Sequence, residues 1–155
     1  SHIQDLDCII DSVPIAKGNT LYCAKVEIRV TYTPPVPPTV TIQAASDIEE
    51  TTATGNGNIT VTGNETCDKR GIVYDLASHG DPGNTAPADS DYAYYEEETD
   101  GFGTGAFTRS LTSLSPGTKY YARAYAHSEN GYGYSAEIDF TTKPNPPTNL
   151  TAVLQ

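Results

Sequence analysis

One short run carries the clearest structural signal in the chain: Leu114-Ser115-Pro116-Gly117-Thr118-Lys119-Tyr120-Tyr121-Ala122-Arg123-Ala124-Tyr125-Ala126. Its second half predicts a β-strand, in which alternate side chains lie on the same face. If Tyr120 faces inward, the three alanines at the following alternate positions face inward with it. Small residues in a row require large partners across the core. The candidates for these partners are Phe107, Leu111, Ile138 and Phe140.

The same alternation predicts that Tyr121, Arg123 and Tyr125 face outward. Exposed Tyr and Arg side chains often anchor interfaces, so these three residues are a candidate binding surface. The alternative interpretation is cross-strand packing, with Arg123 paired to Glu137 or Asp139 on the last strand.

Segments on both sides of this run also have strand character. Short runs bounded by turn residues occur at 39–44, 52–62, 70–74, 106–114, 120–126 and 136–142, and a further short strand is expected within 92–98. No long stretch has the apolar period of a helix. Six or seven short strands in about 100 residues predict an all-β fold, a sandwich of the immunoglobulin type.

The segment 39–143 resembles the fibronectin type III family, in particular its divergent bacterial and phage-associated forms. The resemblance rests on Leu114, Pro116, Gly117 and Tyr120, which match the Leu-x-Pro-Gly-Thr-x-Tyr turn of that family. It implies that Tyr120 is a tyrosine corner, with its ring buried and its hydroxyl bonded to nearby backbone. Segments that resemble other strands of the family are 70–74, 103–108 and 136–142. The Trp that is common on the family's second strand is absent.

Two proline-rich segments divide the chain. Residues 34–38 hold four prolines in five positions and predict a stiff linker, because proline lacks an amide donor. Residues 1–33 predict a strand pair that belongs to a preceding or partner β-domain, since two strands alone are only marginally stable. Residues 144–155 predict a second proline spacer that continues into a strand-like tail.

Charge and composition exclude several classes of function. The formal net charge of −11 repels phosphate backbones and argues against nucleic-acid binding. No apolar run approaches the length that crosses a membrane, so membrane insertion is not expected. The absence of Met indicates a processed product or a segment of a larger protein. Of the three cysteines, Cys8 and Cys23 are predicted to form a disulfide, and Cys67 has no obvious partner.

The sequence contains no nucleophile–base arrangement and no metal-ligand motif, so we expect no catalysis, no cofactor and no bound metal. The acidic residues within 81–100 are a candidate Ca²⁺ site, but their spacing fits no EF-hand loop, and a solvated acidic segment is expected instead. Sequons for N-glycosylation begin at Asn58, Asn64 and Asn149 and are acceptors only in a host that glycosylates.

Together these observations predict a non-catalytic structural or assembly module of an extracellular surface protein, filament or virion. The alternative is an accessory or spacer module of a secreted polysaccharide-degrading enzyme. The expected partners are copies of the chain or adjoining modules, joined by strand addition at exposed strands, with glycans as further candidate ligands. Whether the chain is a polymer subunit or a fragment of one long protein stays open at this point.

Overall fold

The computed structural model describes residues 34–148. Three predictions lie outside these residues: the strand pair of residues 1–33, its disulfide between Cys8 and Cys23, and the strand-like tail from residue 149 onward. They stay predictions. Within the described residues, Cys67 is a buried free thiol.

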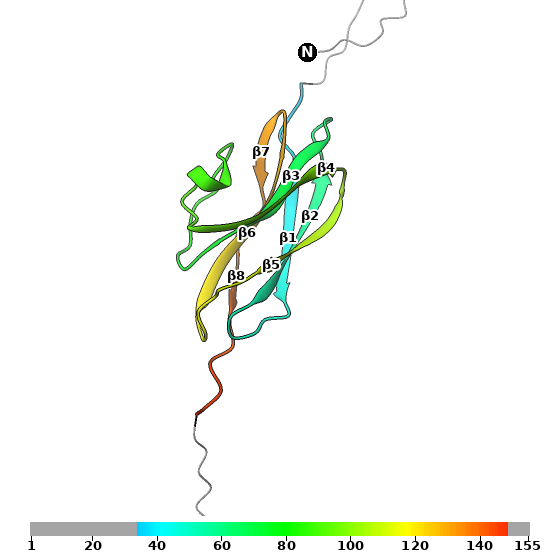
Figure 1. Cartoon of the computed structure of the whole chain (residues 1–155). Helices are drawn as coiled ribbons and strands as arrows, with labels where there is room; N and C mark the ends of the chain where they lie inside the picture. Colours follow the sequence, from blue (N-terminus) through cyan, green and yellow to red (C-terminus); the bar gives the residue numbers. More distant parts are fainter. Residues whose placement is uncertain (1–33, 149–155) are drawn as a thin grey trace, which may run out of the picture. The chain divides into compact units, whose positions relative to one another are not determined.

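The described residues form two antiparallel sheets that pack face to face (Figure 1). The first sheet has the order β1-β2-β5, with β1 at Thr39–Ser46, β2 at Ala53–Val61 and β5 at Gly105–Leu111. The second sheet consists of β4 (Tyr94–Phe102), β3 (Cys67–Asp75), β6 (Lys119–Ser128), β7 (Gly131–Tyr134) and β8 (Ile138–Thr141). The predicted all-β, immunoglobulin-like sandwich of fibronectin type III type is therefore confirmed.

One edge of the second sheet is an interrupted strand. Both β7 and β8 pair with β6, where β7 lies opposite Tyr125 to Ser128 and β8 lies opposite Lys119 to Ala122. Between them, the Ser135 backbone N–H donates to the Ala124 carbonyl at 2.9 Å, and the Ser135 hydroxyl accepts from the Ala124 N–H at 2.9 Å. Strand β7 was not predicted, because two of its four residues are glycines, which weaken a strand signal.

The core between the sheets contains the side chains that were predicted to face inward from β6. Tyr120, Ala122, Ala124 and Ala126 are all buried there. The four large partners expected across the core belong to the same cluster, with Phe107, Leu111 and Phe140 buried and Ile138 partly buried. The alternation of β6 therefore fixes which side of the second sheet faces the first.

Small residues replace the missing Trp on the second strand. Inward positions of β2 include Gly55 and Gly57, and the ring of Phe107 on β5 lies directly against Gly57. A large side chain at that position would overlap the Phe107 ring, so the phenylalanine fills the space from the neighbouring strand.

The described residues include one helix, a 3₁₀ turn at Pro87–Asp89. Among residues 34–148, no helix is both long enough and apolar enough to cross a membrane.

Candidate functional site

The corner residue Tyr120 fastens the turn between β5 and β6. Its ring is buried in the core, and its hydroxyl accepts a hydrogen bond from the Ser115 backbone N–H at 2.9 Å. Leu114 is also buried, and Gly117 has a φ of 61°, a conformation that favours glycine. This arrangement is the tyrosine corner that the family resemblance implies.

The same turn forms hydrogen bonds with the residues at which the chain leaves the sandwich. The Gly117 N–H donates to the Lys143 carbonyl at 2.9 Å. The buried Thr142 hydroxyl donates to the Ser115 carbonyl at 2.6 Å and accepts from the Thr118 N–H at 2.9 Å. Residues 142 and 143 are therefore fixed to the β5–β6 turn, and we call this end of the sandwich the exit pole.

A second turn holds Lys143 at the exit pole. Its backbone N–H donates to the Glu49 carbonyl at 3.2 Å, and its ammonium pairs with the Glu49 carboxylate at 2.7 Å. Glu49 lies between β1 and β2, so the exit of the chain is tied to both sheets.

The chain enters the sandwich at the opposite end, which we call the entry pole (Figure 1). Pro38 is buried, and its carbonyl oxygen lies so close to Gly133 of β7 that a Cβ there would overlap it. The Val36 carbonyl oxygen packs equally closely against Gly63 in the turn between β2 and β3. Part of the predicted linker therefore packs against the domain it leads into.

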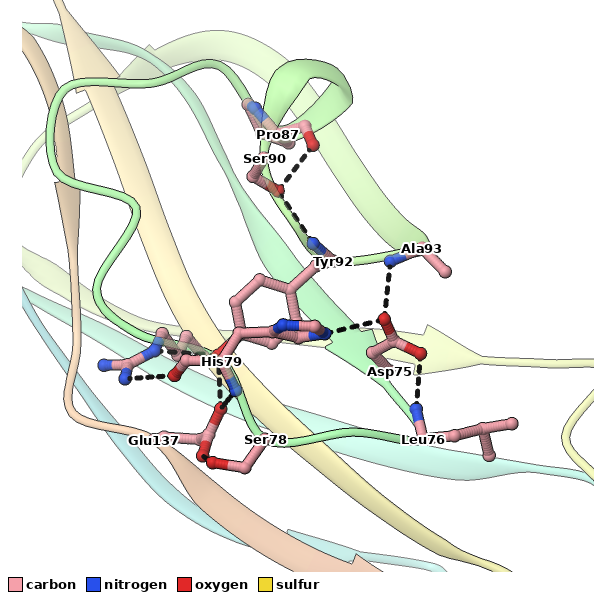
Figure 2. A network of polar contacts seen from close by, with 10 residues as sticks. Asp75, Leu76, Ser78, His79, Pro87, Ser90, Tyr92, Ala93 and Glu137 are labelled. Carbon is pink, nitrogen blue, oxygen red and sulfur yellow. Dashed lines mark hydrogen bonds and ion pairs between the residues drawn. The ribbon is translucent and has the colours of Figure 1, made fainter.

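A polar network anchors the long segment between β3 and β4, residues 76–93 (Figure 2). At its centre is the Arg123 guanidinium on β6, which donates to three groups. These are the Tyr92 hydroxyl at 2.8 Å, the Ser135 carbonyl at 2.7 Å and the His79 carbonyl at 3.1 Å. One side chain on β6 thus binds both the 76–93 segment and the β7–β8 connection.

Glu137 is the second centre of this network. Its carboxylate accepts from the Tyr92 hydroxyl and the Ser78 hydroxyl, both at 2.5 Å, and from the His79 N–H at 3.0 Å. Burial raises the pKa of Glu137, but these hydrogen bonds and the charge of Arg123 outweigh it, so the pKa lies below its ordinary value. Burial raises the pKa of Tyr92, and the bond to Glu137 adds to this effect.

Asp75, the last residue of β3, is the third centre of the network. It lies 2.9 Å from the His79 ring and accepts from the N–H groups of Leu76 and Ala93 at 2.6 and 3.2 Å. Burial raises the pKa of Asp75, and the bonds from His79 and the two N–H groups lower it further than burial raises it. Both carboxylates of the network therefore stay ionised to a lower pH than in an unfolded chain.

This network has the contacts of an anchor rather than of a catalytic centre. The His79 ring pairs with Asp75, and the hydroxyl next to it in sequence, on Ser78, donates to Glu137. Nucleophilic catalysis needs a hydroxyl or thiol within hydrogen-bond reach of the base, and no such bond joins His79 to a hydroxyl among residues 34–148. Arg123, Glu137 and Asp75 instead each bind at least one backbone group of the 76–93 segment.

In the structure, the predicted binding residues Tyr121, Arg123 and Tyr125 do not form one exposed surface. The expectation that Tyr125 is exposed is wrong, because it is fully buried beneath Tyr132 and Tyr134 of β7. Its hydroxyl donates to Glu97 at 3.0 Å. Arg123 is half-buried in the network described above, and Tyr121 is half-buried beside the ammonium of Lys119.

The expected pairing of Arg123 with Glu137 occurs through an intermediate, since the Tyr92 hydroxyl lies between them. Asp139 pairs instead with Lys119 at 3.2 Å. The contacts of Arg123 and Tyr125 are those of packing residues. A binding role for Tyr121 stays a prediction.

The acidic residues within 81–100 do not converge. Glu97 pairs with Lys69 at 3.1 Å, and Glu98 pairs with Arg70 at 2.9 Å and with Arg109. In the part of the chain that the structure describes, no three acidic, His or Cys side chains are grouped so as to hold a metal ion.

Sequence reasoning missed the roles of His79 and Tyr92, and it named Glu137 only as a candidate partner of Arg123. Several of their contacts join distant positions: Tyr92 and Arg123 are 31 residues apart, and His79 and Glu137 are 58 residues apart. No local pattern predicts such pairings. The one available signal was an Arg on a strand whose other face is lined with alanines.

Comparisons with known proteins extend to the fold alone. No family model matches the chain, and no curated protein matches it. Among solved structures, the sensor domain of the anti-sigma factor RsgI4 from Pseudobacteroides cellulosolvens is similar, with a TM-score of 0.49 and 20% identity over 75% of this chain and 99% of that chain. A human fibronectin type III domain from the KIAA0970 protein is similar with a TM-score of 0.49 and 17% identity, over 76% and 82% of the two chains.

Proposed function

We propose that this chain supplies a non-catalytic structural module of an extracellular surface protein, filament or virion, joined in series through its two poles. The observation that carries the proposal is the fixed position of the two points where the proline segments join the sandwich. Pro38 packs at the entry pole, and Lys143 is tied to two turns at the exit pole, directly before Pro144. Neighbours attached to these segments are held at opposite ends of a rigid sandwich.

The strand arrangement suits a module that carries tension. The first strand, β1, begins at the entry pole and pairs with β2, whereas the last strand, β8, ends at the exit pole and pairs with β6 in the other sheet. A pull on the two ends therefore acts along these strands. The ladder hydrogen bonds of each strand must then break together rather than one after another.

Two arrangements of neighbours fit this geometry. In the first, the neighbours are copies of the same chain, which then forms a head-to-tail filament, because such a contact does not close. In the second, they are other domains of one long protein, including a secreted enzyme that degrades polysaccharides.

Deletion of residues 1–33 distinguishes the two arrangements. Light scattering and electron microscopy should be applied to the full chain and to the shortened chain at equal concentration. A filament subunit forms long assemblies that the deletion abolishes, and a spacer is monomeric in both forms. A chain that cleaves a polysaccharide, with the activity lost by one substitution, would contradict the non-catalytic proposal itself.

A further inference from the structure

A small pocket opens between the two sheets near the exit pole. Its volume is 190 Å³, and its lining comes from the end of β3, the start of β4 and the β5–β6 turn. Small-molecule sites are commonly larger than about 300 Å³, so this pocket has room for one small group rather than for an oligosaccharide or a nucleotide. Neither the pocket nor its ligand depends on the role proposed for the two poles.

Tyrosine rings form the floor and one wall of the pocket. Tyr74 and Tyr120 are buried at its base, with ring centroids 6.3 Å apart. Tyr94 stacks on Tyr74 with centroids 5.4 Å apart, and half of its surface is exposed at the mouth. The faces of tyrosine rings carry partial negative charge and attract cations.

The charge at the pocket comes from Glu96. This residue is the first of three consecutive glutamates on β4, and the other two, Glu97 and Glu98, pair with Lys69, Arg70 and Arg109. No cation lies within ion-pair distance of Glu96 among residues 34–148. Arg109 is close enough to sense the charge of Glu96, but its guanidinium pairs with Glu98.

The hydroxyl of Tyr74 stays protonated inside the pocket. Burial raises the pKa of Tyr74 to about 12, and the nearby charge of Glu96 contributes to the rise. Tyr74 lines the pocket, and its hydroxyl makes no hydrogen bond to another described residue. It is therefore available to a ligand as an uncharged hydrogen-bonding group.

We propose that this pocket binds an organic cation, namely an alkylammonium group the size of a lysine side chain. The carboxylate of Glu96 supplies the opposite charge, and the rings of Tyr74 and Tyr94 contact the alkyl chain and the cation. The net charge of −11 draws cations toward the molecule. Two sources present this chemistry, a lysine on a partner protein and a free amine.

The test is an NMR titration of the full chain with N-acetyl-L-lysine N-methylamide, in which the backbone amides of Tyr94, Glu96 and Ser113 are followed. The uncharged analogue N-acetyl-L-norleucine N-methylamide has the same alkyl chain without the ammonium group. We expect saturable shifts at these three amides with the lysine compound and about tenfold weaker binding of the norleucine compound. Equal binding of the two compounds, or no shift with either, overturns the proposal.

Three variants locate the site. Glu96→Gln and Tyr94→Ala should each weaken binding of the lysine compound by about tenfold. Glu65→Gln removes the same charge from an exposed turn outside the pocket, and it should leave binding unchanged. If Glu65→Gln weakens binding as much as Glu96→Gln, the protein attracts cations through its net charge alone and the pocket is not the site.

The two sources are separated by comparing butylammonium with a lysine-centred pentapeptide. A lysine from a partner protein predicts tighter binding of the peptide, whose backbone can reach the unpaired edge of β4. A free amine predicts that butylammonium binds at least as tightly as the peptide. If neither compound shifts the three amides, no alkylammonium binds there and the proposal fails.

Discussion

Tyr120 joins the core to the exit pole through two different interactions. Its ring stacks on Phe140 with centroids 5.7 Å apart, and its hydroxyl fixes the Ser115 N–H at the turn. The ring contributes apolar burial, and the hydroxyl satisfies a backbone donor. These two contributions are separable by substitution.

Removal of the Tyr120 ring should cost far more stability than removal of its hydroxyl. We expect Tyr120→Ala to lower the free energy of unfolding by about 3–5 kcal/mol, because it leaves a cavity in the core. Tyr120→Phe should cost about 0.5–1.5 kcal/mol, the value of one hydrogen bond. Urea unfolding measures both, and Tyr121→Ala, on the other face of β6, is the control. Equal losses for Ala at positions 120 and 121 would contradict the assignment of the two faces.

At the scale of elements, most strands were predicted from sequence, and the errors have physical causes. Strand β4 extends to Phe102, beyond the predicted segment 92–98. The extension was not predicted, because Asp100 and Gly101 have the composition of a turn. Alternation correctly predicted the face of Tyr125 but not its burial. The covering rings of Tyr132 and Tyr134 belong to a glycine-rich strand that no local pattern indicates.

The segment 76–93 should become less tightly held in acid. The pKa values of Asp75 and Glu137 lie below their usual values of 3.8 and 4.5 in the folded protein. A lowered pKa contributes stability that is complete above the usual value and is lost as the pH falls through the lowered one. The contribution of Glu137 therefore begins to decline below about pH 4.5 and that of Asp75 below about pH 3.8, and each is lost once the pH falls below the lowered pKa.

Amide chemical shifts of Ala93 and His79, whose N–H groups donate to Asp75 and Glu137, measure this loss. We expect an inflection below pH 3.8 for Ala93 and below pH 4.5 for His79. Asp75→Asn should remove the inflection of Ala93 and leave that of His79. Inflections at or above the two usual values would show that the carboxylates gain nothing from the network.

Strand β7 also fixes the entry pole, and Gly133 tests this contact. A Cβ at position 133 would overlap the Pro38 carbonyl oxygen, whereas one at Gly103 would meet nothing within 4 Å. We expect Gly133→Ala to lower the free energy of unfolding by about 1–3 kcal/mol, the usual cost of overpacking. Gly103→Ala should change it by less than about 0.5 kcal/mol. Equal effects in thermal unfolding would mean that Pro38 does not pack against β7.

At the scale of the whole molecule, the sequence predicted the sandwich but not the contacts that fix the two poles. The corner turn was recognisable from Leu114 to Tyr120. Its bonds to Thr142 and Lys143, however, join residues that are 24 or more positions apart in the chain. The network around Arg123 was hidden for the same reason. Such contacts follow from the fold as a whole, so they become visible only when the strands are assembled.

Single-molecule pulling in two geometries tests whether the module carries tension between its two poles. In the first, handles at the two ends of the chain pull along β1 and β8. In the second, the handles are at residues 34 and 130, which both lie near the entry pole, so that the pull acts across the strands. We expect a clearly higher unfolding force in the first geometry, because whole ladders must break together. Equal forces, or a lower force from pole to pole, would contradict it.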